Sequence, residues 1–157
     1  MRQWRGEKDM ERTDKACQYH EQGCNCCQSV LAAFSDLTGI GEAESMRIGG
    51  GFGNGAGTGE LCGAITGAVM VLGMLAPCDP DNPAAVKREA VGLSKEFQKR
   101  FQERFGALRC QELLPLRFTP DDTTPAAKRM GLTHHCRIMI VTAVEIVEGM
   151  IAERGLA

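Results

Sequence analysis

The chain lacks several features that mark common classes of protein. Aromatic residues make up only 5% of its 157 residues, and the formal net charge is −2. A slightly negative net charge argues against the concentrated basic face that is typical of nucleic-acid-binding proteins. The longest apolar run, residues 64–76, is too short to cross a bilayer, and the charged N-terminus MRQWRGEKDMERTDKA has no signal-peptide core. We therefore expect a cytoplasmic protein that neither inserts into a membrane nor binds nucleic acid.

Sequence patterns of hydrolases and nucleotide-binding proteins are also missing. No Ser/His/Asp arrangement or carboxylate pair supports a hydrolase. The stretch GFGNGA, residues 51–56, nominally fits a dinucleotide-binding pattern, but the preceding GEAESMRI is a poor strand and no GK[ST] follows. We expect no nucleotide binding, and we interpret the glycines as residues that allow close backbone approach.

Apolar residues recur at helical spacing, and no useful alternating strand pattern is present. The sequence predicts one all-α domain over residues 1–157, a helical bundle in which a glycine-rich loop precedes a central apolar helix. Residues 1–14 are expected to form a flexible N-terminus. The first predicted helices cover residues 10–19, residues 25 to the glycines at 39 and 41, residues 42–48 and residues 60–75. A long helix from residue 83 to Gly106, a short one over residues 107–114 and a C-terminal helix from residue 134 follow.

Local capping signals support several of these helix starts. NCCQ at residues 25–28 fits a capping box, Asn82 precedes the long helix, and Thr133 is the expected cap of the C-terminal helix. Glu145 and Glu148 should face outward on that last helix. The helices that begin near residues 25, 60 and 133 each carry an apolar stripe, so we expect them to pack together, while residues 115–131 read as turns.

The chain has eight cysteines, which in a reducing compartment favour metal binding or redox chemistry over structural disulfides. Four of them, Cys26, Cys62, Cys110 and Cys136, fall in or near the first turn of separate predicted helices. Free N–H groups and the positive end of the helix dipole favour a thiolate there. We expect the four to converge in one pocket, with N–H groups of the glycine loop, at Gly59 and Gly63, directed to the sulfur charge. The four form no paired CxxC pattern of the kind that marks zinc sites. Free cysteine is often buried, so the alternative is that the four are small buried core residues.

Other residues are candidates for additional ligands. Cys24 and Cys27 stand at CxxC spacing, and His135 lies in the HHC stretch at residues 134–136. His20 and His134 are more typical of surface or capping positions, and Cys17 and Cys78 look incidental.

The elements GCNCCQSVLAAF, GGGFGNGAGTGELCGAITGAVMVLG, FGALRCQELL and HHCRIMIVTAVEI occur in this order. Over residues 15–150 the chain thereby resembles the C_GCAxxG_C_C family of redox-active proteins, with the motif cysteines at positions 26, 62, 110 and 136. The resemblance implies a redox function but does not identify the reaction. Family members are often encoded near transport genes, which implies an unidentified, transport-associated redox partner protein. Cys17, Cys24, Cys27 and Cys78 depart from the family pattern.

Three classes of function stay open on the sequence alone. The first is electron transfer or redox sensing, as an electron carrier or an oxidoreductase, through a four-cysteine iron–sulfur centre. The second is a metal-free thiol–disulfide protein with a low-pKa attacking thiol such as Cys26 or Cys62. The third is a zinc-stabilised structural or interaction domain. A homo-oligomer is compatible with all three.

Overall fold

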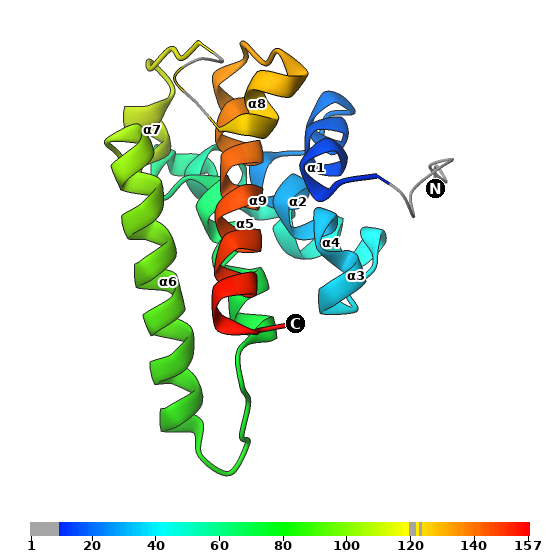
Figure 1. Cartoon of the computed structure of the whole chain (residues 1–157), viewed down its shortest axis with the longest axis vertical. Helices are drawn as coiled ribbons and strands as arrows, with labels where there is room; N and C mark the ends of the chain where they lie inside the picture. The colour runs from blue at the N-terminus through cyan, green and yellow to red at the C-terminus, as the bar shows by residue number, and fades with distance from the viewer. Residues whose placement is uncertain (1–9, 120–121, 123) are drawn as a thin grey trace.

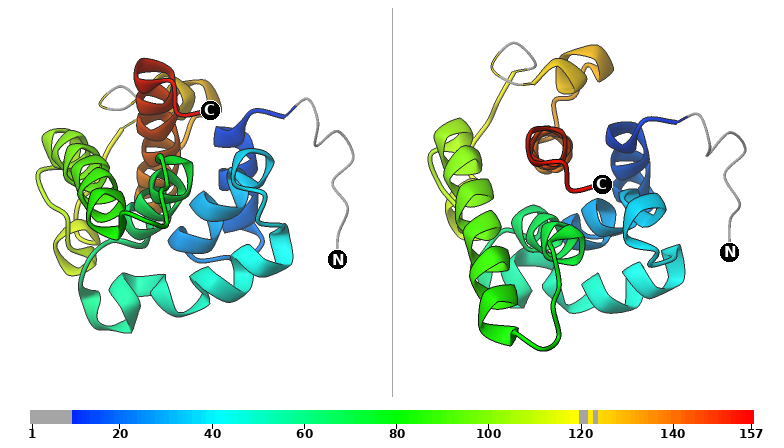
Figure 2. Two further views of the ribbon diagram at one scale, coloured as in Figure 1. Left: turned by 90° about the horizontal axis from the view of Figure 1, so that it is seen from below. Right: turned by 60° about the horizontal axis from the view of Figure 1, so that its bottom comes forward.

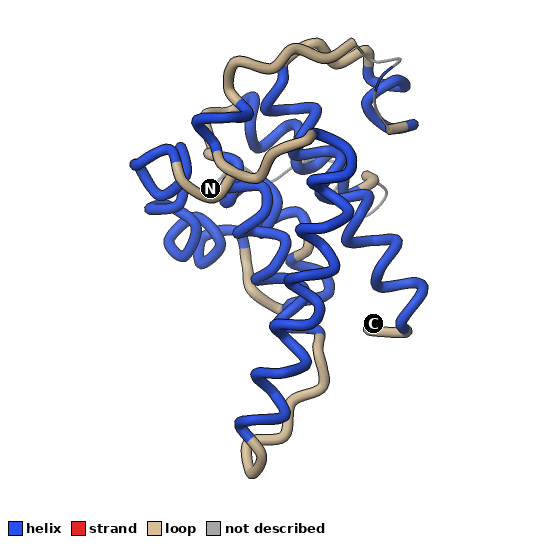
Figure 3. The backbone as a smooth tube through the Cα atoms, turned by 90° about the vertical axis from the view of Figure 1, so that its left-hand side faces the viewer, coloured by secondary structure: helices blue, strands red, loops and turns tan. Residues whose placement is uncertain are grey.

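The computed structural model describes residues 10–119, 122 and 124–157, and in this part of the chain it contains helices and loops but no strand (Figures 1 and 3). The predicted all-α fold, a single helical domain, is confirmed. Residues 1–9 of the expected flexible N-terminus lie outside the described residues. Its remaining residues, 10–14, lead into the first helix and form its beginning. The helices are α1 (Arg12–Glu21), α2 (Cys26–Ala33), α3 (Ser35–Thr38), α4 (Glu42–Gly49), α5 (Gly63–Leu75), α6 (Pro83–Phe105), α7 (Cys110–Leu113), α8 (Pro125–Met130) and α9 (His135–Arg154).

Helix α9 lies at the centre of the molecule, where α1, α2, α5, α6 and α8 contact it. The right-hand view of Figure 2 looks almost along α9, with α6, α5 and α1 around it. The three helices predicted to pack together, α2, α5 and α9, do contact one another. Buried side chains of these helices and of α6 form one continuous core, which includes Val30, Phe34, Ile65, Leu72, Phe97, Phe101, Ile140 and Val147. No described helix is both long and apolar enough to cross a membrane.

Two of the predicted caps are present. Asn25 and Gln28 form the reciprocal capping box at the start of α2, with both hydrogen bonds at 2.8 Å. The side chain of Asn82 accepts a hydrogen bond from the backbone of Ala85 and begins α6. These interactions lie within one turn of chain, so a local sequence pattern suffices to predict them.

Other boundaries differ from the prediction. The helix expected from residue 25 onward breaks at Phe34, where the backbone leaves the helical region, and continues as the short α3. Helix α9 has His134 rather than Thr133 at its N-cap. Helix α8 lies in a segment read as turns, and its Ala126 N–H donates to Glu145 of α9. Glu145 and Glu148 are partly exposed, as an outward position requires, but both also make contacts: Glu145 binds the start of α8, and Glu148 lies beside Arg12.

Candidate functional site

One cavity is lined by all four cysteines that the sequence placed at helix starts. Its volume is about 20 Å³, which is room for roughly one water molecule. The four cysteines are far apart in sequence, so the fold brings them together. The lining residues are Cys26, Asn54, Cys62, Gly63, Cys110, Leu113, Leu114, His135, Cys136 and Met139.

Each of these cysteines stands at the beginning of a helix. Cys26 and Cys110 are the first residues of α2 and α7, Cys62 is the N-cap of α5, and Cys136 is the second residue of α9. The first turn of a helix has N–H groups without intrahelical partners. The cavity is therefore surrounded by the N-terminal ends of four helices.

The glycine loop holds the start of α2 in place. The Asn25 side chain donates to the carbonyl groups of Gly49 and Gly50, at 3.1 and 3.2 Å, and Gln28 donates to the Met46 carbonyl at 2.9 Å. A Cβ atom on Gly53 would lie 2.8 Å from the Asn25 Cβ atom, a distance that real Cβ atoms do not adopt. The loop therefore needs glycine to pass this close to the residue before Cys26.

A short backbone pairing sets Cys62 beside Cys110. Leu61 and Arg109 form an isolated antiparallel bridge. The Cys62 N–H donates to the Leu108 carbonyl at 2.9 Å, and the Cys110 N–H donates to the Glu60 carbonyl at 2.6 Å. Because residues 60–62 take part in this pairing, α5 begins after Cys62 rather than at residue 60 as predicted.

The two glycines expected near the site occupy different places. Gly63 lines the cavity, and a Cβ atom there would lie 3.0 Å from the Cys27 backbone nitrogen. Gly59 is not among the lining residues. Its φ is +73°, and it lies against the side chain of Gln111. The loop follows helix α4, so it lacks the preceding strand of a dinucleotide-binding fingerprint.

Cys26 and Cys136 form a pair of interacting thiols in the cavity. The interaction with Cys136, together with burial, holds the pKa of Cys26 well above its usual range. The interaction with Cys26 lowers the pKa of Cys136 to about 7, helped by the positive charges of Arg117 and Arg137 and opposed by burial. At neutral pH a large fraction of Cys136 is therefore thiolate.

The other two sulfurs favour the thiol form. Burial raises the pKa of Cys62 to about 11, although the N–H groups of Ala64 and Ile65 donate to its sulfur and oppose the shift. Burial also raises the pKa of Cys110, whose thiol donates to the Asn54 side chain at 3.3 Å. The expectation that Cys26 or Cys62 is the low-pKa thiol was therefore wrong, because the interaction with Cys136 and burial raise the pKa of Cys26 and burial raises the pKa of Cys62. The thiol with the lowered pKa is Cys136.

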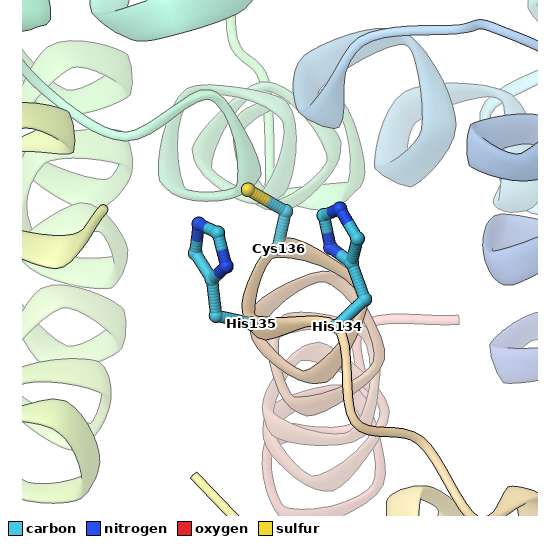
Figure 4. Close-up of side chains that lie close together, drawn as sticks. All are labelled: His134, His135 and Cys136. Atoms are coloured by element: carbon cyan, nitrogen blue, oxygen red, sulfur yellow. The ribbon is translucent and has the colours of Figure 1, made fainter. Parts of the chain in front are cut away.

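Two histidines flank Cys136. The ligand atoms of His134, His135 and Cys136 all lie within 4.8 Å of one another, and Figure 4 shows the two imidazoles on either side of the thiol. Burial lowers the pKa of both histidines, and so does the charge of Arg117. Neutral imidazole is the form that binds metals.

Residues 24–150 match the family described as "Putative redox-active protein (C_GCAxxG_C_C)". The chain belongs to the C_GCAxxG_C_C family. It is thus a member of a cysteine-rich redox family, and it also has a group of histidine and cysteine residues able to hold a metal. Neither the curated proteins nor the solved structures give a significant match.

The cysteines outside the family motif lie away from the cavity. Cys24 donates to the sulfur of Met46 at 3.4 Å, and Cys27 is fully buried between α2 and α5. Cys17 is buried and donates to Glu21, and burial raises its pKa to about 11. Cys78 is exposed. Cys24 and Cys27 are therefore not among the residues that line the cavity.

Sequence reasoning missed three contributors to the site. Asn54 has a left-handed backbone (φ 52°), which asparagine tolerates better than most residues, and its side chain reaches Cys110. A single asparagine among glycines was the available signal. Arg117 and Arg137 act on Cys136 by charge. Arg137 is the next residue after Cys136 in the sequence, whereas only the fold brings Arg117 near α9.

Proposed function

We propose that this protein is a thiol–disulfide redox protein in which Cys26 and Cys136 alternate between dithiol and disulfide. The observation that carries the proposal is that Cys26 and Cys136, in the first turns of α2 and α9, line the same cavity and shift each other's pKa in opposite directions. A thiol and a neighbouring thiolate are the two partners that a disulfide joins. The small cavity suits this chemistry because no other group has to fit between the sulfurs.

The two cysteines take different roles in the reaction. The Cys136 thiolate attacks one sulfur of a disulfide R–S–S–R, forming a mixed disulfide and releasing one RS⁻. Cys26 then loses its proton to solvent and attacks the Cys136 sulfur, which releases the second RS⁻. Two electrons pass from the two cysteine sulfurs to the disulfide, which leaves as two thiols once protonated.

The substrate of this exchange is a disulfide of a redox partner, which we propose to be a protein. Leu114 lines the cavity and is 40% exposed, so only this side chain separates the cavity from solvent on that side. A partner's disulfide would approach Cys136 there. All eight cysteines are free thiols in the structure, the state that a reducing compartment such as the cytoplasm would maintain.

The test is to treat metal-free, reduced protein with oxidised glutathione and to map disulfides by mass spectrometry. We expect a Cys26–Cys136 bond in the wild type and a glutathione adduct on Cys136 in Cys26→Ser, which lacks the second thiol. Cys78→Ser, at an exposed cysteine outside the cavity, serves as the matched control and should react as the wild type does. Oxidation confined to other cysteines would contradict the proposal.

An iron–sulfur centre is a second candidate, favoured by a different observation. Four cysteines from four helix starts line one cavity, and thiolates with nearby N–H donors are the usual surroundings of such clusters. Its role would be electron transfer or redox sensing. A single tetrahedral zinc would need all four sulfurs about 3.8 Å apart, given zinc–sulfur bonds of about 2.3 Å. Among the described residues, the group of ligand atoms mutually within 4.8 Å consists of two histidines and only one of these cysteines.

Cys62→Ser separates the two candidates. If the protein purified without air, or reconstituted with iron and sulfide, holds a cluster, this variant should lose it. The Cys26–Cys136 disulfide, in contrast, should still form in Cys62→Ser. Iron and sulfide content, together with the visible absorption spectrum, measures the first property, and disulfide mapping measures the second.

A further inference from the structure

The start of α9 presents three metal-binding side chains in consecutive positions. His134 is the N-cap and has an extended backbone, whereas His135 and Cys136 are already helical. This change of direction lets three successive side chains reach the same side, as Figure 4 shows. Their ligand atoms, two imidazole nitrogens and one sulfur, lie within 4.8 Å of one another.

A second observation points to a ligand at this place. The Nε2 atom of His135 is buried and has no hydrogen-bond partner. Buried polar atoms in proteins are almost always paired, and an unpaired one needs an explanation. His135 also lines the cavity beside Cys136, and that cavity has a volume of about 20 Å³. A metal ion bound through Nε2 would satisfy the unpaired nitrogen.

Two imidazoles and one thiolate form a borderline-soft donor set that suits zinc. Three protein ligands leave a fourth position open, and the cavity has room for one water. We infer that His134, His135 and Cys136 bind a zinc ion, and that oxidation of Cys136 to a disulfide with Cys26 releases it. The release step rests on the proposed function, whereas the binding step does not.

Zinc binding and disulfide formation both require the sulfur of Cys136, so they exclude each other. Zinc binds thiolate, whereas a disulfide sulfur carries no charge to offer the metal. When Cys136 forms its bond with Cys26, the site keeps only two imidazoles and loses its charged ligand. The electrons and protons balance as in the exchange above: a disulfide oxidant takes two electrons from the two sulfurs, and Zn²⁺ leaves without changing its own oxidation state.

Binding is tested with cobalt(II), a spectroscopic substitute for zinc, titrated into reduced, metal-free protein. We expect one equivalent to bind with sulfur-to-cobalt charge-transfer absorption, and zinc to displace it. His134→Ala and His135→Ala should each weaken binding about tenfold or more, and Cys136→Ser should remove the charge-transfer band. The matched control is His20→Ala, because His20 packs against His134 but is outside the ligand group. It should bind cobalt as the wild type does.

Two results would overturn the binding step: unchanged cobalt affinity in both histidine variants, or loss of binding in Cys62→Ser with no loss in the histidine variants. The second result would move the metal to the four-cysteine cavity as a whole. Circular dichroism of each variant checks that it has folded.

Release is tested by adding oxidised glutathione to the zinc-loaded protein with a colorimetric zinc indicator. The wild type should release zinc as the Cys26–Cys136 disulfide appears by mass spectrometry, whereas Cys26→Ala should release zinc only as a glutathione adduct forms on Cys136. A disulfide that forms while zinc stays bound would overturn the release step and leave the proposed function standing. Zinc binding without disulfide formation in any form of the protein would instead contradict the proposed function and keep the zinc site.

Discussion

The chemistry of the site depends on which of the two sulfurs keeps its proton. The interaction with Cys136 and burial raise the pKa of Cys26, which therefore keeps its proton at neutral pH. The interaction with Cys26 and the charges of Arg117 and Arg137 lower the pKa of Cys136 to about 7. Two thiols of the same cavity thus have different protonation states.

This assignment predicts the pH dependence of Cys136 alkylation. The thiolate is the reactive form, so the iodoacetamide rate of the metal-free protein should rise with pH around a midpoint near 7. Cys26→Ala removes this interaction and should move the midpoint to higher pH. Cys26→Ser keeps a hydroxyl group in its place and should leave the midpoint close to that of the wild type. Mass spectrometry of the Cys136 peptide gives the rates, and equal midpoints in all three proteins would refute the assignment.

At the scale of the helices, glycine allows α2 and α5 to approach closely. A Cβ atom on Gly67 of α5 would lie 2.8 Å from the carbonyl oxygen of Cys27, and the neighbouring backbone cannot move without shifting α2. Gly73, one and a half turns further along α5, has no atom within 4 Å of its Cβ position. The two glycines therefore have different roles in one helix.

Substitution of these glycines by alanine should have opposite effects on stability. Gly67→Ala should lower the free energy of unfolding by about 1–3 kcal/mol, because the added methyl group forces α5 away from α2. Gly73→Ala is the matched control and should raise it by up to about 1 kcal/mol, since alanine favours the helix. Urea unfolding monitored by circular dichroism measures both. A Gly67→Ala protein as stable as the wild type would show that this close contact carries little weight.

Helix boundaries show which parts of the fold could be predicted from the sequence. The capping box of Asn25 and the cap of Asn82 involve residues within one turn, so their patterns are visible locally. The start of α5 depends on backbone pairing with residues 108–110, and the start of α8 depends on Glu145. These partners are distant in sequence, and no local pattern contains them.

The same distinction applies to the site. The four cysteines could be selected because each stands near a predicted helix start, which is a local property. Their pKa order could not, because it depends on burial and on contacts that exist only in the fold. Helix N-termini alone predicted a lowered pKa for Cys62, yet burial raises it to about 11.

At the scale of the whole molecule, the Cys26–Cys136 pair joins distant parts of the chain. Cys26 lies in the first turn of α2, and Cys136 lies in the first turn of α9, which packs against most of the other helices. A disulfide between them would close a loop of about 110 residues. Oxidation at the site should therefore change the stability of the entire domain, beyond its local effect on the cavity.

The oxidised protein should be more stable than the reduced protein by about 2–5 kcal/mol, because the cross-link restricts the unfolded chain. Urea unfolding of both forms, with a chelator present to exclude metal binding, measures the difference. The m value should fall on oxidation, since a cross-linked unfolded chain exposes less surface. Cys26→Ala treated with the same oxidant is the control and should show neither change. If oxidation instead destabilises the wild type, the two sulfurs cannot bond without distorting α2 or α9, and the proposed disulfide would have to be abandoned in favour of the cluster.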